Sequence, residues 1–257
     1  MELLALFLVF FIGSVFGSFT GVLAERLPKG ESVLVNRSHC VSCRRKLAPF
    51  ELVPIVSYLL QKGKCRSCKA KIPKKLLYVE IFAGFTFVSL YLYYLNFGSN
   101  VFQLIYLLVV SIIFIAIFLS DLDFGIIPDQ LVLAFLVIVV FYSVIFMPYS
   151  FLNRFEAGLG FSLFFLFLNL ITRGKGMGFG DVKLAFPLGF FLGFPNVITA
   201  FYVAFLTGAL VSIILVLWGK KSFQKSTIPF GPFLIFAAAF SYFFGQAIID
   251  FALKTFF

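Results

Sequence analysis

Two aspartates stand at the ends of long apolar segments in a chain that has only eleven Asp and Glu among 257 residues. Asp121 follows an apolar run, and Asp181 follows the glycine-rich run Gly174 to Gly180 and precedes another apolar run. An acid inside a membrane span costs about 2.5 to 3.5 kcal/mol on insertion scales, and such residues usually serve a function. Two carboxylates in one partly dry site cannot both ionise easily. One would hold a proton while the other acts as a base toward water, which is the chemistry of aspartyl hydrolysis.

Each acid also has a structural interpretation. Asp129 follows Pro128 and is favoured as the N-cap of the next span, Asp181 could cap its own helix, and Asp123 could be a solvated turn residue. The glycines before Asp181 weaken a helix and let a backbone approach closely, which suits a site that receives an extended peptide.

All four cysteines lie in one polar loop, as two C-x-x-C pairs with 21 residues between them: Cys40, Cys43, Cys65 and Cys68. This is close to the spacing of a zinc ribbon, whose four thiolates leave no open position on the metal, so the sequence predicts structural Zn²⁺. Two disulfides are the alternative if the loop faces an oxidising compartment. His39, the single histidine, is expected to be a surface turn residue and not a ligand.

The elements that carry these residues are apolar segments. The chain is 61% hydrophobic and contains 40 Phe, which indicates an all-α polytopic membrane protein with about eight spans. The sixth, 182–194, would reach only about 20 Å as a helix, against about 30 Å of hydrocarbon, and contains Pro187, so it is expected to be short, kinked or re-entrant. The expected spans are 3–23, 76–97, 101–119, 130–147, 157–171, 182–194, 196–218 and 230–252.

Charge predicts the orientation. Thirteen of the 21 Lys and Arg lie in the loop from Ala24 to Lys75, which is therefore expected in the cytoplasm. We predict three parts: a first transmembrane helix at 1–23, a cytoplasmic zinc-ribbon-like loop at 24–75 and a transmembrane core at 76–257. Contact with anionic lipid and membrane topology explain the net charge of +10, so no nucleic-acid partner is expected.

Taken together in order, these segments resemble the bacterial prepilin peptidases, also called type IV leader peptidases, over nearly the whole chain. The similar segments are Gly17-Ser18-Phe19 with Arg26-Leu27-Pro28, the paired C-x-x-C loop, Pro54 to Leu59, Gly63 to Cys68, Ile72, Glu80, the Asp121 turn with Ile127-Pro128-Asp129, and Gly178 to Leu184.

The resemblance implies a bifunctional enzyme of the bacterial inner membrane. Its catalytic pair would be Asp121, seven residues before Pro128, and Asp181 of the G-x-G-D motif, with Asp123 as the less favoured first acid. Supporting motif residues would be Gly178, Gly180 and Lys183. The expected substrates are prepilin and pseudopilin precursors, cut at the cytoplasmic face and then N-methylated from S-adenosyl-L-methionine. Gly63 and Lys64 match the family's methyltransferase-associated segment.

Thr20-Gly21 and Glu25 differ from the family's usual residues near the first span. Two alternatives remain: a related intramembrane G-x-G-D protease without methylation, and a non-enzymatic scaffold in which the zinc ribbon recruits a partner.

Overall fold

The computed structural model of the chain describes residues 2–33, 38–98, 100–174, 176–218 and 229–256. Most of these residues are helical and the described part contains no named strand, as the sequence predicts. Residues 34–37 of the predicted zinc loop lie outside the described part. The chain divides into two compact units, residues 1–116 and 117–257, and each is described by itself.

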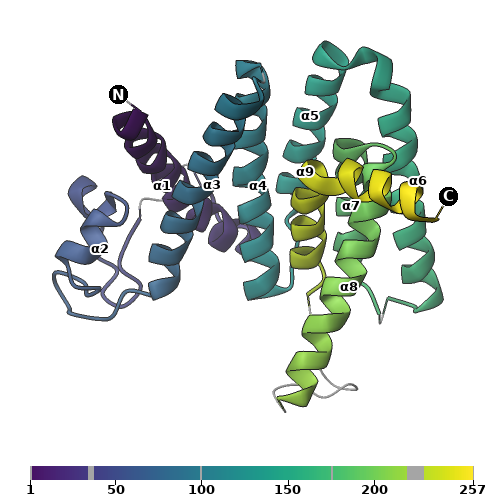
Figure 1. The fold of residues 1–257 in the computed structure, drawn as a ribbon. Helices are drawn as coiled ribbons and strands as arrows, with labels where there is room; N and C mark the ends of the chain where they lie inside the picture. The colour runs from purple at the N-terminus through teal and green to yellow at the C-terminus, as the bar shows by residue number, and fades with distance from the viewer. Residues whose placement is uncertain (1, 34–37, 99, 175, 219–228, 257) are drawn as a thin grey trace. The chain divides into compact units, whose positions relative to one another are not determined.

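The first unit is built on two long helices, α1 (Glu2–Arg26) and α3 (Lys74–Phe97), which lie side by side (Figure 1). Small residues allow this close approach, because a Cβ on Gly17 of α1 would lie 2.7 Å from the Cβ of Ala83 and 3.0 Å from the Cα of Glu80. The packing therefore holds the faces of α1 and α3 that carry Ser18 and Glu80 at one end of this helix pair.

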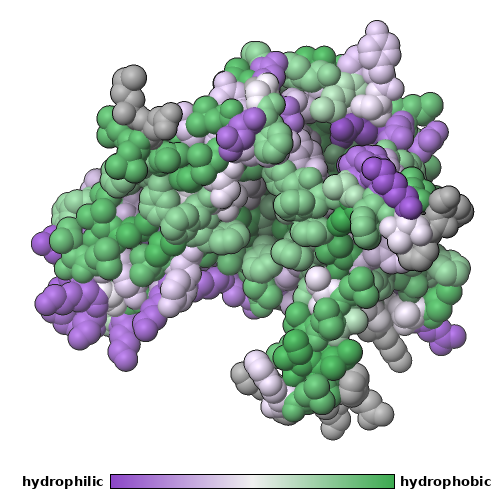
Figure 2. All heavy atoms as spheres, in the orientation of Figure 1, coloured by the Kyte–Doolittle hydropathy of each residue, from purple (hydrophilic) through white to green (hydrophobic). Residues whose placement is uncertain are grey.

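The segment between α1 and α3 has little regular structure. It contains three short helices, η1 (Leu27–Lys29), η2 (Pro49–Leu52) and α2 (Val56–Leu60), and two isolated β-bridges. Figure 2 shows hydrophilic atoms gathered around this end of the first unit, while the helices present mostly hydrophobic atoms. Such a small segment has little apolar core of its own, so it requires another source of stability.

The second unit contains α5 (Asp129–Phe146), α6 (Phe151–Ile171), α7 (Phe179–Leu192), α8 (Asn196–Leu217) and α9 (Gly231–Phe256), with the short η3 (Pro148–Ser150) before α6. The helix α4 (Val101–Phe124) begins in the first unit and ends in the second. Seven of the described helices are long and apolar enough to cross a membrane. The chain is therefore a multi-pass membrane protein.

The helix α7 is short, with 14 residues, and it packs against α5, α6, α8 and α9 (Figure 1). Most of its side chains are buried, including Pro187 inside the helix. Its contact with α6 is close, since a Cβ on Gly189 would lie 2.6 Å from the carbonyl oxygen of Ala157. At its end, the Arg154 guanidinium donates to the carbonyl of Phe191 at 2.6 Å, which satisfies a terminal acceptor. These contacts fix the helix that carries Asp181.

The helix boundaries differ from the expected spans in two places that matter. The third apolar segment stays helical through Phe124, so Asp121 lies in the last turns of α4 and not in a turn after it. The fifth begins at Phe151, six residues earlier than expected, which brings Arg154 into the helix. The sixth segment is the short, proline-containing α7, as predicted, and whether it crosses the bilayer stays a prediction.

Candidate active site and candidate metal centre

Asp121 is held near the end of α4 with 5% of its surface exposed. Its Oδ2 accepts a hydrogen bond from the backbone N–H of Gly231, the first residue of α9, at 2.9 Å. The neighbouring Ser120 is fully buried and donates to the carbonyl of Ile126 at 2.7 Å, which fixes the turn between α4 and α5. The carboxylate is therefore positioned by two elements far apart in sequence.

Asp181 lies in the first turn of α7 with 6% of its surface exposed. Its Oδ2 accepts from the N–H of Gly178, the N-cap residue, at 3.2 Å. The loop before it is anchored to α6, because the Asn169 side-chain amide donates to the carbonyl of Met177 at 2.7 Å. The expected capping role is thus present, and it leaves the second carboxylate oxygen with further capacity to accept hydrogen bonds.

The segments that carry the two buried acids approach the same side chain, Ile127. A Cβ on Gly180 would lie 3.3 Å from the Ile127 Cβ, and a Cβ on Gly231 would lie 3.2 Å from its Cδ1. The charges of Asp121 and Asp181 are close enough to interact. The turn after α4, the start of α7 and the start of α9 therefore bring two carboxylates of the second unit into one neighbourhood. Such a pair can hold one proton between them and act as acid and base.

Sequence reasoning missed Gly231. A Cβ at this position would lie 2.6 Å from the Oδ2 of Asp121, so only glycine admits the carboxylate at its observed place. A signal was present in the sequence, because Pro232 directly after Gly231 is typical of the first turn of a helix and marks the start of α9. It identifies a helix start but not the acid that approaches it.

The other acids near the site have different surroundings. Asp129 was predicted to be the N-cap of its helix, which is wrong: Pro128 is the N-cap, and the Asp129 carboxylate accepts from the Lys183 ammonium at 2.8 and 3.0 Å. Asp123 is exposed. Lys183, expected to support the motif, therefore links α7 to the start of α5 through an exposed ion pair, which stabilises a protein by about 1 kcal/mol at most.

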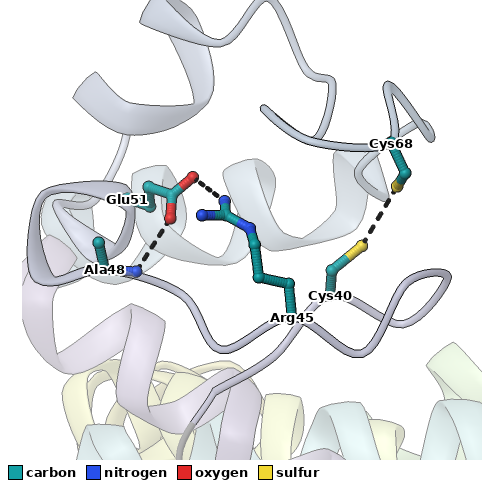
Figure 3. A network of polar contacts seen from close by, with 5 residues as sticks. All are labelled: Cys40, Arg45, Ala48, Glu51 and Cys68. Atoms are coloured by element: carbon teal, nitrogen blue, oxygen red, sulfur yellow. Dashed lines mark hydrogen bonds and ion pairs between the residues drawn. The ribbon is translucent and has the colours of Figure 1, made fainter.

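The four cysteines form a compact cluster in the first unit. Their sulfur atoms all lie within 4.8 Å of one another, and Cys40 Sγ and Cys68 Sγ are 3.8 Å apart (Figure 3). Sulfurs bound to one tetrahedral Zn²⁺ at about 2.3 Å lie about 3.8 Å from each other, so the arrangement fits this ion. No disulfide joins these four residues.

Each C-x-x-C pair sits on the same kind of turn. In the first, the N–H of Arg44 donates to the Cys40 carbonyl at 2.8 Å, and the N–H of Cys40 donates to Arg45 at 2.9 Å. In the second, the N–H of Lys69 donates to the Cys65 carbonyl at 3.0 Å. Backbone N–H groups point at the sulfur atoms, and those of Cys68 and Ser67 lower the pKa of Cys65 to about 6. Backbone N–H groups also lower the pKa of Cys40.

An ion pair between the buried Glu51 and the partly exposed Arg45 fixes the first cysteine turn (Figure 3). The Glu51 carboxylate accepts from the Ala48 N–H at 2.9 Å and from Arg45 at 2.6 Å. The pKa of Glu51 is lowered first by the Ala48 N–H and then by Arg45. His39 is exposed, as expected, and its backbone bridges to Lys46. The cluster needs only its four sulfurs as ligands.

Gly63 and Lys64 lie in the turn before Cys65. Gly63 has a positive φ of 65°, and a Cβ there would lie 2.8 Å from the hydroxyl oxygen of Tyr58. Lys64 is exposed and forms a backbone bridge with Lys71. The described contacts of these two residues are structural.

Comparison with known proteins gives consistent results. The family model described as Bacterial Peptidase A24 N-terminal domain matches residues 11–94, and the Type IV leader peptidase family matches residues 108–213. A protein of Bacillus subtilis (strain 168) is 34% identical over 96% of this chain and 97% of its own length. A protein of Pseudomonas aeruginosa is 29% identical over 92% of this chain and 89% of its own, and one of Aeromonas salmonicida is 28% identical over 96% and 94%.

All three relatives carry the name prepilin leader peptidase/N-methyltransferase. No solved structure matches this chain. The identity with the first relative extends over almost the full length of both proteins, and the two family models match in the expected order on either side of residue 100. The chain belongs to the type IV leader peptidase family.

Proposed function

We propose that the chain cleaves the leader of prepilin-like precursors with Asp121 and Asp181 and then N-methylates the new N-terminus. The observation that carries the peptidase assignment is a pair of buried carboxylates on segments that approach the same residue, Ile127. Each carboxylate accepts a hydrogen bond from a backbone N–H, and neither forms an ion pair with Lys or Arg within the described residues. Relatives named prepilin leader peptidase/N-methyltransferase supply the substrate class.

The chemistry follows from one shared proton. The ionised carboxylate takes a proton from water as the water oxygen attacks the scissile carbonyl carbon, and the protonated carboxyl donates its proton to the carbonyl oxygen. As the tetrahedral intermediate collapses, the C–N bond breaks and the amine leaves with a proton from the first carboxyl. The second carboxylate takes a proton from a hydroxyl group of the intermediate, so the pair again holds one proton. The N–H groups of Gly178 and Gly231 hold the two carboxylates in place throughout these steps.

The position of the site suits this substrate. A precursor with an apolar N-terminal helix stays in the bilayer, so its scissile bond lies at the membrane surface. The loop that holds most of the basic residues is expected in the cytoplasm, and we place Asp121 and Asp181 on that same side of an inner membrane.

The cysteine cluster would hold Zn²⁺ through Cys40, Cys43, Cys65 and Cys68, with all four coordination positions filled by the protein. The ion would stabilise the loop between α1 and α3 and would not contact the peptide. Methylation requires a methyl donor, and S-adenosyl-L-methionine supplies an electrophilic methyl group on a positively charged sulfur when bound.

The test is cleavage of a prepilin by the purified full-length protein in detergent. Asp121→Asn and Asp181→Asn keep the size of the side chain and remove its proton chemistry, so each is expected to lower the cleavage rate by at least about 10²-fold. Asp250→Asn, an exposed acid of α9, is the matched control, and Asp123→Asn tests the less favoured acid. Unchanged cleavage in either of the first two variants, with an unchanged melting temperature, would refute the assignment.

Mass spectrometry of the product separates the two activities. With S-adenosyl-L-methionine present, the new N-terminus is expected to gain the mass of a methyl group. A product that is always unmethylated would leave a protease alone, and a protein that binds zinc but cuts nothing would leave a scaffold.

A further inference from the structure

The first unit contains a cavity of about 330 Å³ that the peptidase chemistry does not use. It lies between the cysteine turns and the adjoining ends of α1 and α3, and its walls include Ser18, Tyr58, Gln61, Ile72, Leu76 and Glu80. The volume is at the lower end of the range for small-molecule sites, which are mostly apolar with a few placed polar groups. A compact organic ligand is therefore the appropriate class of occupant.

Glu80 is the unusual residue of this cavity. It lies in α3, one of the helices long and apolar enough to cross a membrane, and a carboxylate there usually has a function. Its Oε2 accepts from the N–H of Ile55 at 2.7 Å, and it is also hydrogen-bonded to Ser18. Both donors are neutral, and Glu80 forms no ion pair with a Lys or Arg within the described ranges. A half-buried carboxylate with neutral partners leaves its charge available to a cation in the cavity.

The Glu80 carboxylate also holds in place the cavity wall that α2 contributes. Ile55 has a φ of 61°, which is strained for a β-branched residue, and its N–H is bound by Glu80. The strained backbone at Ile55 and its hydrogen bond to Glu80 together fix the start of α2 against α3. The site is therefore preorganised in the absence of a ligand.

Gly63, which the resemblance predicts to be methyltransferase-associated, contacts the wall of this cavity through Tyr58. A Cβ on Gly63 would lie 2.8 Å from the Tyr58 hydroxyl oxygen and 3.0 Å from the adjacent ring carbon, so the bare backbone lets the ring take its place in the wall. Gly63 is thus a positioning residue and does not itself line the cavity.

We propose that this cavity binds S-adenosyl-L-methionine, with the Glu80 carboxylate facing a positive charge of the ligand. The proposal rests on the proposed N-methylation. The ligand has a sulfonium and an ammonium group against one carboxylate, for a net charge of about +1 at neutral pH by the usual ionisation of such groups. The apolar walls suit its adenine ring. Of the two carboxylates that line the cavity, Glu51 is paired with Arg45, whereas Glu80 forms no ion pair within the described residues and so suits the ligand's positive charge.

The test is equilibrium binding of S-adenosyl-L-methionine to the full-length protein in detergent by calorimetry. Glu80→Gln keeps an oxygen that accepts from Ile55 and removes the charge, and we expect its Kd to rise about tenfold or more. Gln61→Lys adds a positive charge to the same wall and should raise the Kd as well. The matched control is Glu25→Gln, an exposed acid of α1 outside the cavity, which should bind as the parent does.

A parallel titration with S-adenosylhomocysteine, which lacks the sulfonium charge, locates the contact. If Glu80→Gln weakens both ligands, the carboxylate faces the ammonium group; if it weakens only the sulfonium ligand, it faces sulfur. Zinc content and melting temperature, equal to those of the parent, show that the variants are folded.

The proposal is overturned if the parent binds S-adenosyl-L-methionine and both cavity variants bind it with an unchanged Kd. If the parent itself shows no binding and no methylation, the proposed methyltransferase function fails as well. The two failures are therefore distinguishable.

Discussion

Replacing Gly231 with alanine tests whether the start of α9 positions the catalytic carboxylate. A Cβ at residue 231 would lie 2.6 Å from Asp121 Oδ2, 3.1 Å from its Cγ and 3.2 Å from the Cδ1 of Ile127. Contact at an ordinary distance of about 3.4 Å or more requires the carboxylate to move by several tenths of an ångström. The Gly231 N–H bond to Asp121, now 2.9 Å, would lengthen or break.

The magnitude follows from two independent scales. A hydrogen bond to a charged group contributes about 1.5 to 3 kcal/mol, and a misplacement of about 1 Å in a catalytic site can cost about 10²-fold in rate. We therefore expect Gly231→Ala to cut a prepilin about 10- to 100-fold more slowly than the parent. The assay is the initial rate of cleavage in detergent, with the melting temperature measured on the same sample.

The matched control is Gly160→Ala in α6. A Cβ there meets nothing within 4 Å, so the same substitution adds a methyl group to open space. We expect its cleavage rate to equal that of the parent. A Gly231→Ala protein that cuts as fast as Gly160→Ala would refute the role of α9 in positioning Asp121.

Three further predictions concern the helix α7, the carboxylate pair and the metal. Arg154→Ala leaves the carbonyl of Phe191 without the Arg154 donor, so we expect the free energy of unfolding to fall by about 1 to 3 kcal/mol. A lower melting temperature would show this loss, and Arg154→Lys should restore part of it. Cleavage by the acid pair should have a bell-shaped pH profile, since the reaction needs one proton on the pair; a rate that is flat with pH contradicts this. Zinc should be retained at neutral pH and lost on strong acidification, because protons compete with the ion for its four thiolate ligands. A zinc-sensitive dye measures the release, and retention at pH 4 would refute the prediction.

Sequence patterns predicted the elements of the fold because the apolar segments are long. The helical class, the short sixth segment with Pro187 and the clustering of four cysteines all follow from local composition and spacing. The end of the third span was misplaced because Ser120, Asp121 and Asp123 are polar, whereas the helix continues to Phe124 and buries Ser120 and Asp121.

The long-range contacts were not predictable in the same way. The hydrogen bond between Gly231 and Asp121 joins residues 110 apart, and the contact between Glu80 and Ile55 joins a helix to a strained turn. Both depend on how helices pack, which local hydrophobic patterns do not specify. The ion pair of Lys183 with Asp129 is of the same kind. The predicted N-cap was wrong because the helix already begins at Asp129, with Pro128 before it in an extended conformation.

The division of roles between the two units also depends on packing. Asp121 and Asp181 belong to the second unit, while the cysteine cluster and the Glu80 cavity belong to the first. The order of the motifs along the chain is consistent with this separation, but only the structure places Glu80 beside the cysteine turns. The two proposed activities can therefore be impaired by separate substitutions.

The central claim is that Asp121 and Asp181 act together on one peptide bond. A structure of the full-length protein with a precursor peptide bound, carrying Asp181→Asn to prevent turnover, tests it most directly. We predict that the scissile carbonyl, or a water next to it, lies within hydrogen-bond distance of the side chains at both positions, about 2.6 to 3.2 Å. A scissile bond that contacts only one of them, or that lies at neither, would contradict the two-aspartate mechanism.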